Sequence, residues 1–159
     1  MSSDAAPHAS SLSFLLSQVG AERAASFARV SAQVGVTPRG YAVLAVLSAD
    51  YTPSQQQLAD RLGIHRNNMV ALIDDLESRG LVERRRDPAD RRAFRLHRTS
   101  SGSRTVTRIG RFVAELDAEL ETLLGRAQVE TLRALMELLA SGLGLQTGIH
   151  PSLHDSPGT

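Results

Sequence analysis

The sequence predicts a mainly α-helical fold with one small β-hairpin, and two observations lead to this prediction. From about residue 10 to residue 143, apolar residues recur mostly at three- and four-residue spacing, which is the pattern of amphipathic helices. The pattern changes only between residues 81 and 98, where two short, partly alternating runs flank the turn sequence DPAD. We therefore expect a single domain over 10–143, with flexible tails of small and polar residues at 1–9 and 144–159.

The first two helices are separated by a clear interruption. Apolar residues at helical spacing predict the first helix over about residues 10–34, and the sequence GVTPRG then breaks the pattern. Thr37 followed by Pro38 combines an N-cap with a first-turn proline, which is how helices commonly begin. The second helix is therefore expected to start there and to end near Asp50.

The third and fourth helices also carry terminal signals. Ser54 and Gln57 have the spacing of a capping box, which indicates the start of the third helix. The fourth is expected over about residues 65–79, where Gly80 provides the left-handed residue that often follows a helix. The runs LVERRR and AFRLHR after Gly80, joined by DPAD, predict a two-stranded hairpin.

Two further helices are expected between about residues 100 and 143. The first has an apolar seam with heptad-like spacing, which is typical of a helix packed against other helices. The seam consists of Val106, Ile109, Val113, Leu116, Leu120 and Leu123. The last helix is expected over about residues 128–143.

The third and fourth helices have features of a helix-turn-helix. Ala59 and Gly63 lie four residues apart, where two crossing helices need a small residue and the turn needs positive φ. Arginine can pair with guanine, asparagine with adenine, and a small apolar side chain with the thymine methyl group. An ordinary helical hairpin with a polar outer face is the alternative interpretation. The candidate base-reading residues on the fourth helix are Arg66, Asn67, Asn68, Val70 and Ala71.

The hairpin concentrates positive charge. Eight arginines and three acidic residues lie between Arg79 and Arg98, giving a local balance of +5 in a chain whose net charge is +1. A charged run is often only a solvated surface, but a helix-turn-helix followed by an arginine-rich hairpin is the element order of a winged helix. Arginines at such a tip suit the narrow minor groove of DNA, so we expect Arg91 and Arg92 to contact it. Asp90 is expected either to orient the Arg92 guanidinium or to act only as a turn residue.

The segment LADRLGIHRNNMVALIDDLESRGLVERRRDPADRRAFRLHRTSSG resembles the winged helix of MarR-type bacterial transcription regulators. The similarity includes GLVER after the fourth helix and DPADRR in the hairpin, and it extends outward over about residues 10–143. It implies a winged helix over about 37–99 and dimerisation helices over about 10–34 and 100–143. One departure stands at the exit of the second strand, where Arg98-Thr99 replaces the usual Leu-Thr pair; Thr99 can still cap the next helix.

The resemblance implies a homodimer that binds a pseudo-palindromic double-stranded operator, with Arg92 in the minor groove and Asp90 supporting it. The apolar helix seams independently indicate a partner chain, because their apolar surface is larger than one small lobe can cover. The resemblance also implies a repressor released by a small aromatic or anionic effector. Phe14, Arg39 and Tyr41 lie on segments that would line the effector pocket, although such aromatics are more often core residues.

Other functional classes are disfavoured by the sequence. It has no cysteine, its five histidines are scattered, and it lacks a phosphate-binding glycine loop. We therefore expect no enzymatic activity, no metal and no cofactor. No apolar run is long enough to cross a bilayer, so a cytoplasmic protein without membrane contact is expected. A protein-interaction module that keeps the winged-helix fold without binding DNA is the alternative function.

Overall fold

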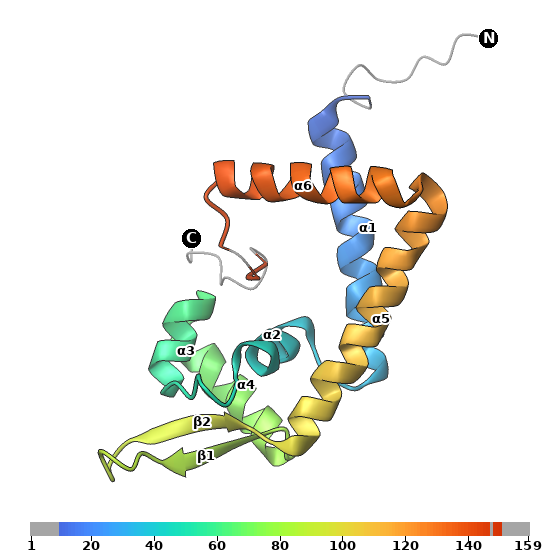
Figure 1. The fold of residues 1–159 in the computed structure, drawn as a ribbon. Coiled ribbons are helices and arrows are strands. Elements are labelled where there is room, and N and C mark those ends of the chain that lie inside the picture. Colours follow the sequence, from blue (N-terminus) through green and yellow to red (C-terminus); the bar gives the residue numbers. More distant parts are fainter. Residues whose placement is uncertain (1–9, 147, 151–159) are drawn as a thin grey trace, which may run out of the picture.

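The computed structural model describes residues 10–146 and 148–150, and its described part is helical except for one hairpin (Figure 1). The prediction of a mainly α-helical fold with a small β-hairpin is confirmed. The sequence interpretation of 1–9 as a tail concerns residues outside the described part. The elements, in chain order, are α1 (Leu12–Gln33), α2 (Pro38–Val46), α3 (Gln55–Leu62), α4 (Arg66–Ser78), β1 (Val82–Arg86), β2 (Phe94–Arg98), α5 (Ser100–Leu124) and α6 (Arg126–Gly142).

A compact lobe contains α2, α3, α4 and the hairpin, and these elements share one apolar core. Each helix contributes side chains that are fully buried, because the apolar positions repeat at helical spacing. The hairpin adds residues from the inner face of each strand, as the two-residue period of a strand requires. The largest fully buried side chains of this core are Leu44, Leu47, Leu58, Leu62, Met69, Ile73, Leu76 and Leu96.

The hairpin is antiparallel, and its open end is fastened to the start of α5. Val82 pairs with Arg98 at this end, and Arg86 pairs with Phe94 near the tip. The Thr99 N–H donates to the Leu81 carbonyl at 3.1 Å, and the Thr99 hydroxyl accepts from the Gly102 N–H at 3.0 Å. The Arg98 guanidinium donates to the Leu44 carbonyl at 2.8 Å. The departure at Arg98-Thr99 thus gives a wing base bonded to α2 and a capped α5.

Three long helices extend away from the lobe. In Figure 1, α5 rises from the hairpin, α6 crosses above the lobe, and α1 runs beside α5. Many of their apolar side chains are exposed in the single chain, including Leu12, Val19, Leu123, Leu138 and Leu143, which are each more than half exposed. These three helices therefore present a large apolar surface that the rest of residues 10–146 and 148–150 does not cover.

Two helix ends differ from the sequence prediction. The second helix ends at Val46 and not near Asp50, because Leu47 adopts an extended backbone and the backbone groups of Ser48 and Tyr51 bond to each other. The last helix begins at Arg126, directly after Gly125 breaks the path of α5 with a φ of 84°. The rest of the predicted order holds.

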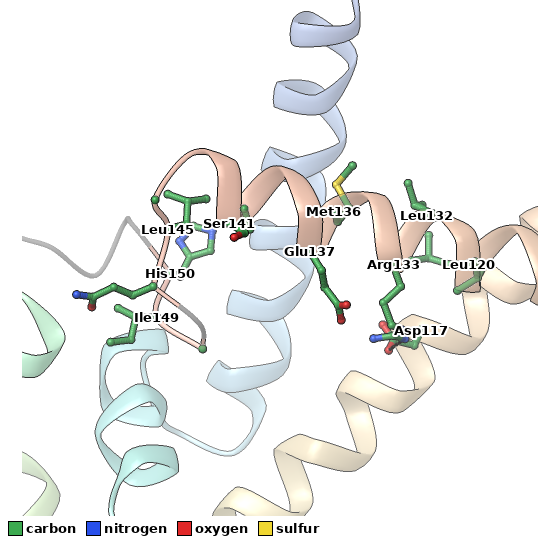
Figure 2. A pocket seen from close by; sticks show the side chains of 15 residues that line it. Asp117, Leu120, Leu132, Arg133, Met136, Glu137, Ser141, Leu145, Ile149 and His150 are labelled. Carbon is green, nitrogen blue, oxygen red and sulfur yellow. Dashed lines mark hydrogen bonds and ion pairs between the residues drawn. The ribbon is translucent and has the colours of Figure 1, made fainter.

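The segment after α6 was expected to be part of a tail, but its described residues touch the lobe. Ile149 is partly buried and packs against the core of the winged-helix elements. A cavity of about 890 Å³ lies between α5, α6 and this segment (Figure 2). Arg133 donates to Asp117 across one side of it at 3.2 Å. None of the described helices is apolar enough over sufficient length to cross a membrane.

Candidate nucleic-acid interface

The turn between α3 and α4 has the geometry that the sequence indicated. Gly63 adopts φ 63°, which is the left-handed region where glycine is favoured, and Ala59 is 2% exposed at the helix contact. The capping box at the start of α3 is complete, with the Ser54 N–H donating to the Gln57 side chain at 2.9 Å. His65, which the sequence reasoning did not assign a role, caps α4 by accepting from the Asn67 N–H through its Nδ1 atom at 3.3 Å.

The outer face of α4 carries the predicted base-reading residues. Met69 and Ile73 are fully buried on the inner face, so the opposite face turns to solvent. Val70 is also exposed, by 38% of its surface. The predicted residues on this exposed face are Arg66, Asn67, Asn68 and Ala71. Their direct contact with bases stays a prediction.

The arginines between Arg79 and Arg98 fall into two groups: those bonded to other groups of the protein, and those whose guanidinium groups have no partner among the described residues. Arg84 belongs to the first group. Its Nη2 atom donates to Asp74 Oδ1 at 2.6 Å and to Gln55 Oε1 at 3.0 Å, while its Nη1 atom donates to Glu77. Partial burial alone would lower the pKa of Arg84, but the hydrogen bonds and charges of Asp74 and Glu77 raise it above the ordinary value. The side chain thus joins β1 to both helices of the helix-turn-helix.

Asp87 and Arg95 form a second internal pair near the tip. Asp87 is only 8% exposed, and Arg95 Nε donates to its Oδ2 atom at 2.6 Å. Arg95 also donates to Gln57 at 3.3 Å, which connects the hairpin to α3. The hydrogen bond from the Ala89 N–H and the bond from Arg95 lower the pKa of Asp87 below its ordinary value. Asp87 is therefore a charged, structural residue of the turn.

Other arginines of the run are also engaged within the protein. Arg79 donates to the Gly35 carbonyl and pairs with Asp75. Arg85 pairs with Glu83 of its own strand. Arg86 lies over the Phe94 ring, 5.5 Å from its centroid, and donates to the Arg91 carbonyl at 2.7 Å. With Arg84, Arg95 and Arg98, six of the eight arginines have partners.

Arg91 and Arg92 belong to the second group. Both are exposed, and within residues 10–146 and 148–150 neither guanidinium has a hydrogen bond or an ion pair. One interpretation of the sequence had Asp90 orienting the Arg92 guanidinium. In the structure, Asp90 Oδ1 instead accepts from the Arg92 backbone N–H at 2.9 Å. Asp90 therefore shapes the turn, and the two tip guanidinium groups stay available to a polyanion.

The three predicted effector residues are not gathered in one protomer. Tyr41 packs edge-on against Phe27 with ring centroids 5.3 Å apart, and Arg39 lies in the first turn of the same helix as Tyr41. Phe14 lies thirteen residues before Phe27 on α1, which is about 20 Å along a helix. None of the three lines the cavity under α6. The aromatic partner that sequence reasoning missed is Phe27, whose position on α1 gave no signal beyond core spacing.

Known proteins with similar sequences and structures agree with this geometry. The sequence profile of the MarR family matches residues 34–93. A putative transcriptional regulatory protein for the hcr operon from Thauera aromatica is 34% identical over 114 residues, or 71% of this chain and 69% of that protein.

Two solved structures are also similar. The transcriptional repressor CouR bound to a 23-mer DNA duplex has 34% identity and a TM-score of 0.72, with 87% of this chain and 99% of that chain covered. CouR bound to p-coumaroyl-CoA has 31% identity and a TM-score of 0.67, with 87% and 98% covered. The protein therefore belongs to the MarR family of transcriptional regulators.

Proposed function

We propose that the protein is a dimeric transcriptional repressor that binds a pseudo-palindromic DNA operator and releases it when a small molecule binds. One observation carries the DNA-binding part. Arg91 and Arg92, whose guanidinium groups have no partner in the described part of the chain, lie at the tip of a hairpin beside a helix whose polar face is exposed. In a winged helix, this arrangement suits a helix in the major groove and a tip in the minor groove. CouR was solved with a DNA duplex, which supports the same ligand here.

The contacts divide by function. Arg66, Asn67, Asn68 and Ala71 are the candidates for base edges, because an exposed helix face is what fits into the major groove. Arg92 and Arg91 are the candidates for the minor groove and the phosphates. Asp90 acts indirectly, by fixing the backbone at Arg92. These assignments define the site that mutation can test.

The dimer is inferred from uncovered apolar surface. In a single chain, apolar side chains along α1, α5 and α6 are exposed, and Leu123, Leu138 and Leu143 each expose more than 70% of their surface. Monomeric proteins rarely leave so many large apolar side chains in water. We assign residues of about 10–34 and 100–143 to dimerisation and residues of about 37–99 to DNA binding. A two-fold dimer places two α4 helices on one side of a duplex, which calls for an inverted repeat.

The effector is proposed to be aromatic and anionic. CouR binds p-coumaroyl-CoA, a thioester that joins an aromatic acyl group to an anionic carrier. Tyr41 on α2 supplies an aromatic ring next to Phe27 of α1, and Arg39 supplies a cation on the same helix as Tyr41. Phe14 would contribute only from a different part of the assembled dimer. We further propose that the protein acts in the cytoplasm and has no catalytic activity, as expected for a relative of transcriptional regulators.

Binding to DNA that flanks the protein's own gene is the direct test. A labelled fragment should bind the purified protein with an affinity that falls steeply as salt rises, because arginine–phosphate contacts release counterions. Adding p-coumaroyl-CoA or related aromatic thioesters should then release it. Affinity that does not change with salt, or a stable complex with another protein and no DNA binding, would favour an interaction module instead.

A further inference from the structure

We propose that Arg84 is a positioning residue for DNA binding, which holds the hairpin at a fixed angle to α4 and so places the Arg92 guanidinium. This inference rests on the proposed function, since it concerns how the same interface is assembled. Arg84 itself is not proposed to contact DNA. Its side chain is 24% exposed and faces the helices of its own chain.

The contacts of Arg84 span three elements of the interface. One nitrogen reaches Asp74 on α4 at 2.6 Å and Gln55 on α3 at 3.0 Å, and the other reaches Glu77 on α4. Glu77 also accepts from the backbone N–H of Arg84 at 2.9 Å. A planar guanidinium with several donors can hold such a set of acceptors at once, whereas an ammonium group cannot match the fork geometry. Arg84 therefore fixes both the position and the orientation of β1 against α4.

The position of Arg84 gives small rotations a large effect at the tip. Arg92 lies beyond the end of β1, and the six residue-to-residue steps from Arg84 to Asp90 span at most about 20 Å. A rotation of about 10° at Arg84 would move the tip by up to roughly 3 Å, whereas binding geometry must be held within about 0.5 Å. Three links on β2 also limit such motion: the Leu96 N–H donates to the Pro53 carbonyl, Arg95 to Gln57, and Arg98 to the Leu44 carbonyl at the base of the hairpin.

Arg84 also balances acidic groups on the helix that faces DNA. The Asp74 side chain is 58% exposed and that of Glu77 is 37% exposed, so both would repel phosphates if they lost their cation. The neighbouring Asp75 is paired in the same way with Arg79. Loss of Arg84 would thus misplace the wing and expose two negative charges beside the duplex.

A double-mutant cycle on DNA affinity tests the inference. Arg84→Met, Arg92→Ala and the double variant are compared with the wild type by fluorescence anisotropy on one operator fragment, at several salt concentrations. If Arg84 acts by placing Arg92, Arg84→Met weakens binding about tenfold in the wild-type background. In the Arg92→Ala background, the factor by which Arg84→Met weakens binding should be smaller by at least about threefold. A difference of this size lies within the usual range for coupled residues. In the wild-type background, the slope of log affinity against log salt should fall by no more than the roughly 1.8 per dimer expected when both Arg92 contacts are lost.

Arg85→Met is the matched control. Arg85 belongs to the same strand and the same arginine run, but it pairs with Glu83 of its own strand and its side chain is 59% exposed. Its replacement should show no coupling to Arg92. The inference is overturned if Arg84→Met and Arg92→Ala are additive, or if Arg84→Met binds as well as the wild type.

Folding and function are separated by two further comparisons. Thermal unfolding shows whether Arg84→Met folds, and a general loss of folded protein would lower affinity equally in both backgrounds. If Arg84→Met does not fold, Arg84→Lys takes its place in the cycle under the same criterion, because it keeps the charge and loses the fork. If the wild type binds no DNA, the proposed function and this inference are both overturned. If the wild type binds DNA but the effects of the two substitutions are additive, only this inference is overturned.

Discussion

Gly102 lies where α5 meets the base of the hairpin, and replacing it with alanine should destabilise the protein. A Cβ atom at this position would lie 2.3 Å from the Leu81 carbonyl oxygen and 2.9 Å from Arg98 Cγ. The backbone must therefore shift, which disturbs the hydrogen bonds from Thr99 to the same carbonyl. Overpacking of this kind costs about 1–3 kcal/mol, and contact with backbone rather than a flexible side chain favours the upper part of that range.

The helix itself gains from the same substitution. Alanine is about 1 kcal/mol better than glycine within a helix, so we expect Gly102→Ala to cost a net of about 1–2 kcal/mol in unfolding free energy. This corresponds to a fall in melting temperature of roughly 2–8 °C for a domain of this size. Thermal unfolding by circular dichroism, at a fixed protein concentration, measures this shift.

Gly110 supplies the control for this prediction. It lies in the middle of α5, and a Cβ atom there would meet nothing within 4 Å. Gly110→Ala should therefore stabilise the protein by up to about 1 kcal/mol, through helix propensity alone. Equal shifts of the same sign for the two variants would show that the close approach at Gly102 has been misread.

Three other substitutions test separate features. Arg92→Ala should lower the slope of log affinity against log salt by about 1.8 per dimer, from two lost contacts of about 0.9 each, and an unchanged slope would remove Arg92 from the interface. Asp87 has a lowered pKa in the folded protein, so its contribution to stability is fully present above the ordinary aspartate pKa. This contribution is lost as pH falls from there through the lowered pKa of the folded state. Stability is measured by unfolding at several pH values between pH 6 and pH 3, which bracket an ordinary pKa of about 4. Asp87→Asn should lose less stability at acid pH than the wild type, and an identical pH dependence would contradict this. Thr99→Ala removes the N-cap of α5 and should cost about 1 kcal/mol in urea unfolding, and no loss would mean that the cap is dispensable.

The elements whose signals are local were predictable from the sequence. Thr37, Ser54 and Thr99 each act as N-caps in the structure, because a cap depends on the residue and on a backbone N–H three positions later. Gly63 was predictable for a similar reason, since its positive φ is set by the short turn itself. The end of α2 was missed, because buried Leu47 continues the apolar pattern while the backbone has already left the helix.

Which arginines form internal contacts and which stay exposed was not predictable, because these roles depend on partners that are distant in the sequence. Arg84 and Arg92 are chemically identical, and only the fold brings Gln55 and Asp74 to the first of them. The close approach at Gly102 is hidden for the same reason, since glycine is also compatible with an ordinary helix position. Sequence patterns thus locate the interface, while the fold determines which of its arginines form internal hydrogen bonds and ion pairs.

Selection of DNA by the purified protein tests most directly whether the two-fold winged-helix interface reads DNA. Random or genomic fragments are bound, recovered and sequenced, and the enriched sequence is aligned about its centre. The proposal predicts an inverted repeat with half-site centres about 10 base pairs or one helical turn apart, since two α4 helices enter successive major grooves. Recovery of fragments with no common sequence, or of a single half-site without symmetry, would contradict it.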